Sequence, residues 1–147
     1  MRPVYETDAD RGREKRIVRS VARFYNSEIL WPLPMKYGAD AFLKHKRSGT
    51  AAWIEIKRRF VGRDHYPTLI LSVSKIKELK NLARETGTGA LVCVAWNDRI
   101  GIISARLVSY RTCDIVMAGR EDRNDPGDME PCFEIPVSQF NNIPWVS

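Results

Sequence analysis

Cysteine is scarce in this sequence, and its placement excludes two common ways of stabilising a small protein. The 147 residues contain three cysteines, Cys93, Cys113 and Cys132, which lie far apart and form no Cys-x-x-Cys pair. An odd number of widely spaced cysteines indicates neither a disulfide framework nor a zinc site. A reducing compartment is the simpler inference, so we expect a cytoplasmic, intracellular protein.

Long hydrophobic runs and repeats are also lacking. No apolar stretch reaches the length of a membrane-spanning helix, and the N-terminus does not follow the pattern of a signal peptide. We therefore expect no membrane association. The chain has no internal repeat, and its length suits one domain with a real core, so residues 1–147 are predicted to form a single domain.

Acidic residues are fewer than basic ones. There are 18 Asp and Glu residues against 24 Lys and Arg, which gives a net charge of +6. An excess of positive charge favours a polyanionic partner such as a nucleic acid, although it does not identify one.

The most informative stretch is the pair of apolar, alternating segments at 37–43 and 51–57. The polar residues between them end in Ser48-Gly49, which is typical of a hairpin turn. We predict two antiparallel strands whose turn is centred on Arg47 and Ser48. Five apolar residues then share one buried face of the hairpin: Ala41, Leu43, Ala52, Ile54 and Ile56.

The same register gathers charged residues on the other face. Asp40 is predicted to lie opposite Glu55, and Lys57 points the same way because it is two residues further along. Two opposed carboxylates repel each other, so a hard cation such as Mg²⁺ between them would account for the arrangement. The alternative is a solvated strand face that has Asp40 at the start of a strand.

Glu14 is a further acidic candidate. A helix is predicted from Thr7 or Asp8 to about Asn26, and Glu14 falls at the edge of its apolar stripe. A carboxylate in such a place needs a partner. That partner is either an arginine on a neighbouring element or the same metal centre, and the sequence leaves both open.

The remaining periodicities predict a mixed sheet, because a helix between two strands indicates a crossover connection. The expected elements are an edge strand or extended entry at 29–36, a short apolar segment at 68–71, a helix at 75–85 capped by Ser72 or Ser74, strands at 90–96 and 99–108, a strand at 115–117, an acidic turn or loop at 121–130, and an edge strand through Phe133, Ile135 and Val137.

At this point the chain resembles the PD-(D/E)XK nuclease superfamily. The resemblance rests on the order of the predicted elements and on the residues that they carry: Glu14 on the first helix, then Asp40, then the tripeptide Glu55-Ile56-Lys57. The resemblance implies an α/β restriction-endonuclease-like fold. Its α-β-β-β-α-β core would cover about 8–105, with a central mixed sheet flanked by helices and a C-terminal β extension at 106–147. Ala39 replaces the motif's proline, which does no chemistry. The first helix, with Arg11-Gly12-Arg13-Glu14, also resembles that of archaeal-type Holliday-junction resolvases.

The resemblance implies Mg²⁺- or Mn²⁺-dependent hydrolysis of DNA phosphodiester bonds. Asp40, Glu55 and the Ile56 carbonyl would hold the metal. Lys57 would position the attacking water or stabilise the phosphate, and Glu14 would bind a second metal or orient a water. The candidates for contacting DNA phosphates are Lys44, Lys46, Arg47, Arg58, Arg59, Arg63, Lys75 and Lys77.

Other functions remain open at this point. The chain could be a non-catalytic DNA-binding or interaction protein on the same fold, or a restriction-like or DNA-processing nuclease of viral origin acting in the host cytoplasm. A resolvase acts on branched DNA and needs two active sites. A resolvase function therefore predicts a homodimer. Nothing in the sequence distinguishes duplex from branched DNA as the substrate.

Overall fold

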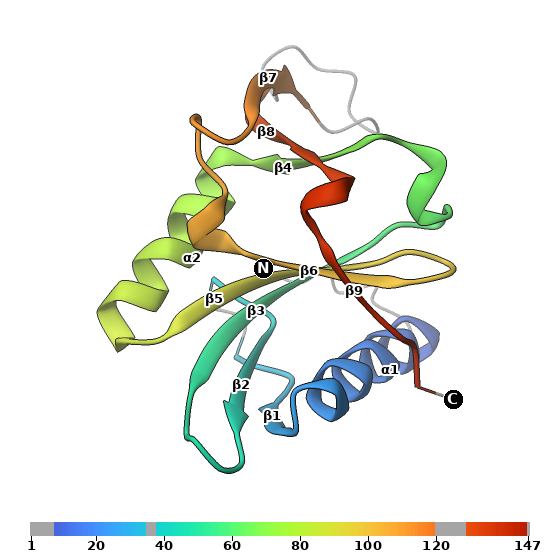
Figure 1. The fold of residues 1–147 in the computed structure, drawn as a ribbon, viewed down its shortest axis with the longest axis vertical. Helices are drawn as coiled ribbons and strands as arrows, with labels where there is room; N and C mark the ends of the chain where they lie inside the picture. Colours follow the sequence, from blue (N-terminus) through green and yellow to red (C-terminus); the bar gives the residue numbers. More distant parts are fainter. Residues whose placement is uncertain (1–7, 35–37, 120–128, 147) are drawn as a thin grey trace.

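The computed structural model describes residues 8–34, 38–119 and 129–146 (Figure 1). Its helices and strands are α1 (Asp8–Phe24), β1 (Ser27–Leu30), β2 (Ala41–His45), β3 (Ala51–Arg58), β4 (Thr68–Ser72), α2 (Val73–Thr86), β5 (Gly89–Ala95), β6 (Ile100–Ser104), β7 (Asp114–Ala118), β8 (Glu130–Pro136) and β9 (Asn141–Ile143).

Two sheets organise the chain. The larger one has the strand order β1-β2-β3-β5-β6-β9, and the smaller one has the order β4-β8-β7. In the larger sheet β3 and β5 are parallel, whereas the other neighbouring pairs are antiparallel. The connection from β3 to β5 passes through β4 and α2, as a parallel pair requires. The predicted mixed sheet is therefore confirmed.

The predicted hairpin register is confirmed in β2 and β3. Ala41 pairs with Ile54, and Leu43 pairs with Ala52. Two hydrogen bonds and a glycine conformation close the turn. The backbone N–H groups of Arg47 and Ser48 both donate to His45 Nδ1 at 3.1 Å, and Gly49 takes the left-handed φ of 75° that favours glycine. The strand β2 begins at Ala41, later than predicted, so Asp40 lies just before it.

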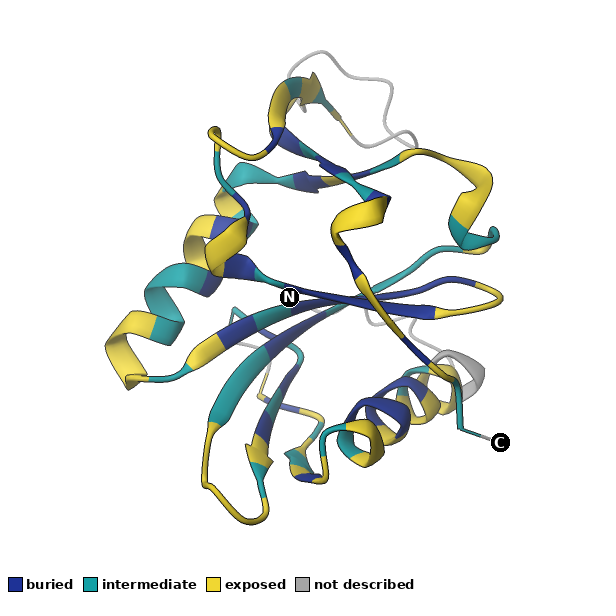
Figure 2. Cartoon of the chain, viewed as in Figure 1, coloured by how far each residue is buried: buried dark blue, intermediate teal, exposed yellow. Residues whose placement is uncertain are grey.

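The larger sheet has a separate cluster of buried hydrophobic residues on each of its two faces. Figure 2 marks the buried residues along the strands and helices in dark blue. Ile54 of β3 packs in a buried cluster with Ile17, Val18 and Val21 of α1. Trp53, on the other side of β3, packs against the cluster that holds α2 and the smaller sheet. Because side chains alternate along a strand, Glu55 and Lys57 share the α2 side with Trp53.

Helix α2 is slightly longer at both ends than the predicted 75–85, and Ser72 is the cap among the two serines that the sequence offered. The Ser72 Oγ accepts a hydrogen bond of 3.2 Å from the Lys75 backbone N–H, and Gly87 closes the helix with a φ of 66°. Ile76 and Leu79 are the buried residues of this helix. The cap therefore fixes the first turn of α2, the turn that presents Lys75 to the larger sheet.

One sequence prediction holds in part and two need correction. The segment 29–36 was predicted as an edge strand or an extended entry, and β1 is an edge strand that ends at Leu30. Pro32 and Pro34, which follow it, lack the N–H that a ladder needs. The strand predicted at 99–108 ends at Ser104, and a 3₁₀ turn follows. β8, predicted as an edge strand, is instead central, because β4 and β7 pair on either side of it.

Some predicted features fall outside the described residues. These are the capping role of Thr7, the beginning of the strand predicted at 37–43 and most of the acidic stretch 121–130. Among the helices that are described, none combines the length and the hydropathy that crossing a bilayer requires.

The Ser72 cap gives a direct test of how α2 is anchored. We expect Ser72→Ala to lower the free energy of unfolding by about 1 kcal/mol, because the Lys75 backbone N–H loses its acceptor. Ser74→Ala is the control, since Ser74 is exposed in the same turn. Urea unfolding of both variants decides the point, and equal losses would contradict the assigned cap.

Candidate functional site

Asp40 is held against β3 by two backbone contacts. Its own N–H donates to the Ile54 carbonyl oxygen at 2.9 Å, and its Oδ2 accepts a hydrogen bond of 2.8 Å from the Ile56 N–H. Asp40 therefore continues the hairpin register although it lies outside β2. Its carboxylate is placed beside Glu55, as the sequence predicts.

Glu55 is the only carboxylate among the buried side chains of the described residues, with 6% of its surface exposed. Two ammonium groups lie next to it: Lys57 Nζ is 3.8 Å from Oε1, and Lys75 Nζ is 3.7 Å from Oε2. Burial, with the nearby charge of Asp40 adding to it, raises the pKa of Glu55 to about 7 even though both lysines oppose the shift.

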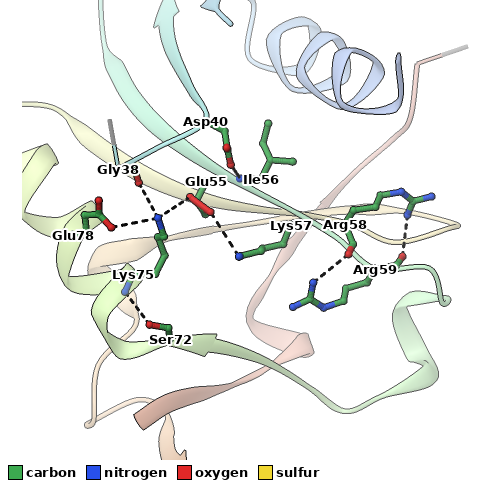
Figure 3. A network of polar contacts seen from close by, with 10 residues as sticks. All are labelled: Gly38, Asp40, Glu55, Ile56, Lys57, Arg58, Arg59, Ser72, Lys75 and Glu78. Atoms are coloured by element: carbon green, nitrogen blue, oxygen red, sulfur yellow. Dashed lines mark hydrogen bonds and ion pairs between the residues drawn. The ribbon is translucent and has the colours of Figure 1, made fainter. Parts of the chain in front are cut away.

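Lys75 occupies the centre of a network that the sequence did not predict (Figure 3). Besides its contact with Glu55, its Nζ lies 3.3 Å from Glu78 Oε2 and donates to the Gly38 carbonyl oxygen at 3.4 Å. Burial lowers the pKa of Lys75, but the charges of Glu55, Glu78 and Asp40 outweigh it, so the pKa is raised. Lys75 was predicted only as a contact to DNA, and Glu78 was not predicted at all.

The donor set suits a hard divalent ion. Asp40 and Glu55 offer carboxylate oxygens beside the backbone of Ile56, and the Lys75 ammonium already lies among oxygen atoms as a cation would. No three His, Cys, Asp or Glu side chains within the described parts of the chain form a complete protein cage. Mg²⁺ does not need such a cage, because it keeps several waters and binds through one or two carboxylates.

Glu14 lies on α1, which covers the opposite side of the sheet from Glu55 and Lys57. It is half-buried, and its Oε1 accepts a hydrogen bond of 2.9 Å from Trp31 Nε1. It also lines a pocket of about 230 Å³ together with Ile56 and Arg58. One partner of Glu14 is thus an indole N–H, and the pocket connects Glu14 to the candidates Ile56 and Arg58.

The predicted DNA contacts near the motif do not form one surface. Arg58 turns toward α1, where its guanidinium carbon lies 4.6 Å from the centre of the Phe60 ring, whereas Arg59 turns toward α2 and the smaller sheet (Figure 3). Alternation along the chain explains the separation. Arg63 is mostly buried, and its guanidinium donates to the Val137 carbonyl oxygen at 3.2 Å.

The other predicted contacts are further away. Lys44 is at the turn end of β2, about 13 Å along the strand from Asp40 at the usual rise per residue. Lys46 and Arg47 follow it in the turn itself, and Lys77 is exposed on α2.

A groove between the two sheets runs past Lys57 and Lys75, the two lysines that neighbour Glu55. A pocket of about 380 Å³ is lined by Lys57, Lys75 and Arg59 on one side and by Cys132 of β8 on the other. Arg59 also lines an adjacent pocket of about 720 Å³, which extends the groove toward Phe60. The C-terminal strands therefore form one wall of the candidate site.

A comparison with models of protein families matches residues 1–143 to a family described as phage putative PDDEXK endonuclease. The chain belongs to this family. The motif residues of the sequence and the family match point to the same superfamily, so the predicted resemblance is confirmed. A comparison with curated proteins found no match.

A solved structure confirms the fold class. Hjc, a Holliday junction resolvase from the archaeal hyperthermophile Archaeoglobus fulgidus, matches with a TM-score of 0.56 and 16% identity, over 88% of this chain and 90% of the resolvase. D212, a nuclease from a fusselovirus, is 15% identical over 97% of this chain and 89% of its own, with a TM-score of 0.49. The likeness to Hjc establishes the restriction-endonuclease-like fold.

The raised pKa of Glu55 predicts a pH effect on the metal-free protein. The pKa of Glu55 is about 7 in the folded protein, above the ordinary value of 4.5 for a glutamate. As the pH rises from the lower to the higher of these values, the free energy of unfolding falls, because Glu55 must then ionise in a buried place. Glu55→Gln removes this cost. We expect its advantage over the wild type in urea unfolding with EDTA to be greater at pH 8 than at pH 5. An advantage that does not change with pH would contradict the assignment.

Proposed function

We propose that this chain is a DNA endonuclease that uses Mg²⁺ or Mn²⁺ to hydrolyse phosphodiester bonds. The observation that carries the proposal is the meeting of Asp40 and Glu55 beside Lys57, a lysine that also lines the groove. Membership of an endonuclease family supports the same conclusion.

Each residue of the motif has a separate role in this proposal. Asp40, Glu55 and the Ile56 carbonyl would hold the ion, which when bound supplies a more acidic water and a positive charge against the phosphate. Lys57 lies beside Glu55 with 32% of its side chain exposed, so it can reach a phosphate in the groove. Its fixed charge would stabilise the negative charge that develops in the transition state.

Glu14 is proposed to assist from the α1 side. Its hydrogen bond to Trp31 orients the carboxylate, and the shared pocket places it near Ile56. From there it would orient a water or contribute to a second metal position.

A cluster of arginines and aromatic rings supports DNA binding on the α1 side. The guanidinium carbons of Arg13 and Arg58 lie 5.8 and 4.6 Å from the Phe60 ring centre, and those of Arg16 and Arg58 lie 4.7 and 5.7 Å from that of Trp145. Burial and the charges of Arg13 and Arg16 lower the pKa of Arg58. A phosphate beside the three guanidinium groups would relieve their mutual repulsion, and Phe60, 65% exposed, offers a surface for a base.

The substrate class is proposed as duplex or branched DNA. The arginines of the α1 side and the groove on the α2 side would contact separate stretches of backbone, which suits a substrate with more than one duplex arm. If the substrate is a four-way junction, a homodimer is needed to supply two active sites. A gel series with plasmid, linear duplex, single strand and four-way junction, each with Mg²⁺, Mn²⁺ or EDTA, tests the proposal.

Lys57→Ala separates catalysis from binding. We expect cleavage to fall on the order of a hundredfold or more, because the lysine acts mainly on the transition state, while DNA affinity is roughly kept. Lys15→Ala is the control, since it removes one charge from an exposed position of α1. Cleavage and gel-shift assays run on the same substrates measure both quantities. If Lys57→Ala cleaves as well as the wild type, the active site lies elsewhere; wild-type binding without cleavage would favour the non-catalytic alternative.

Arg59→Gln tests whether DNA follows the groove. We expect weaker binding and a salt dependence of the binding constant that is shallower by about one phosphate contact. Arg84→Gln is the matched control, because Arg84 is in the last turn of α2, and it should keep the wild-type slope. Affinities measured between low and moderate salt give the slopes; identical slopes for both variants would rule out this path for the DNA.

A further inference from the structure

The ammonium group of Lys75 lies among oxygen atoms supplied by three separate parts of the chain. Glu55 Oε2 comes from β3, Glu78 Oε2 from α2 and the carbonyl oxygen from Gly38, just ahead of β2, at 3.7, 3.3 and 3.4 Å respectively. Carboxylate and carbonyl oxygens are also the ligands that Mg²⁺ and Mn²⁺ prefer. The surroundings of Lys75 therefore resemble those of a bound cation.

Position 38 is a glycine, which leaves room for this arrangement. A Cβ atom at Gly38 would overlap the side chain of Glu78, so a glycine lets the Glu78 carboxylate come close to the backbone. Gly38 precedes Asp40 by two residues. The approach of α2 thus links the segment that carries Asp40 to the Lys75–Glu78 pair.

Lys75 and a metal ion would need the same carboxylate. Glu55 is buried, and an ionised carboxylate in such a place requires a nearby positive charge. In the metal-free protein Lys75 supplies part of that charge. A divalent ion bound to Glu55 would supply more positive charge than Lys75 does. The ion and the Lys75 ammonium would then repel each other.

We propose that Lys75 is a positioning residue that acts as an internal counter-ion: it holds Glu55 in the metal-free protein and is displaced from Glu55 when a divalent ion binds. The proposal rests on the proposed function, because it concerns the same metal position.

Glu78 gives the displaced ammonium a second partner. It is one helical turn from Lys75, and its side chain is 52% exposed at the groove. Lys75 can therefore leave Glu55, keep its contact with Glu78 and turn toward the groove, where a DNA phosphate would lie. No change in the backbone of α2 is required, since the lysine side chain has four rotatable bonds to absorb the movement.

Calorimetric titration with Mn²⁺ in the absence of DNA tests the displacement. Lys75→Met should bind Mn²⁺ more tightly than the wild type, on the order of tenfold, because the competing charge is gone. Lys15→Met, which removes one exposed charge from α1, should stay close to the wild type. Unchanged Mn²⁺ affinity in Lys75→Met would overturn the proposal while leaving the metal-dependent function intact. A wild type that binds no Mn²⁺ would overturn both.

Thermal unfolding in EDTA at pH 8 provides the second measurement. Lys75→Met should lower the Tm, because Glu55 then keeps its charge with less compensation. In a Glu55→Gln background the same substitution should have a much smaller effect, since no carboxylate charge remains to be balanced. An equal loss of Tm in both backgrounds would show that Lys75 stabilises the fold through contacts other than the one with Glu55, and it would overturn the counter-ion role.

Discussion

The buried charge of Glu55 is the constraint on which the candidate site depends. A carboxylate with 6% of its surface exposed, next to a second carboxylate, is unfavourable unless cations surround it. The fold supplies them from two directions, Lys57 from the same strand and Lys75 from α2. Residues that would be ordinary surface charges elsewhere are therefore held in defined places.

The order of the strands explains why these groups meet. β3 is an inner strand of the larger sheet, with β2 antiparallel on one side and β5 parallel on the other. The antiparallel partner brings Asp40 to Ile56, and the crossover to β5 lays α2 over Glu55. β8 then closes the groove from the smaller sheet, so the C-terminal third of the chain contributes to the site rather than merely extending the fold.

Much of this geometry could be predicted from local patterns in the sequence. The hairpin register follows from the alternation of apolar residues and the Ser48-Gly49 turn, and the limits of α2 follow from Ser72 and Gly87. Register and caps are decided by residues close in the chain, so a single sequence contains the information.

Contacts between distant elements were harder to predict. The central position of β8 depends on its pairing with β4 and β7, and the role of Lys75 depends on how α2 crosses the sheet. Lys75 and Glu78 have the spacing of any exposed ion pair on a helix, and Arg58 and Arg59 are adjacent in the sequence although they serve opposite faces. In each case tertiary packing, which no local pattern encodes, decides the outcome.

Asp40 and Glu55 are proposed to form together a site for a divalent cation. Calorimetric titration of the wild type and of Asp40→Asn with Mn²⁺ tests this site without a substrate and without activity. We expect one strong site per chain in the wild type and a large loss of affinity in Asp40→Asn. Equal binding by the two proteins would show that the ion does not bind at Asp40.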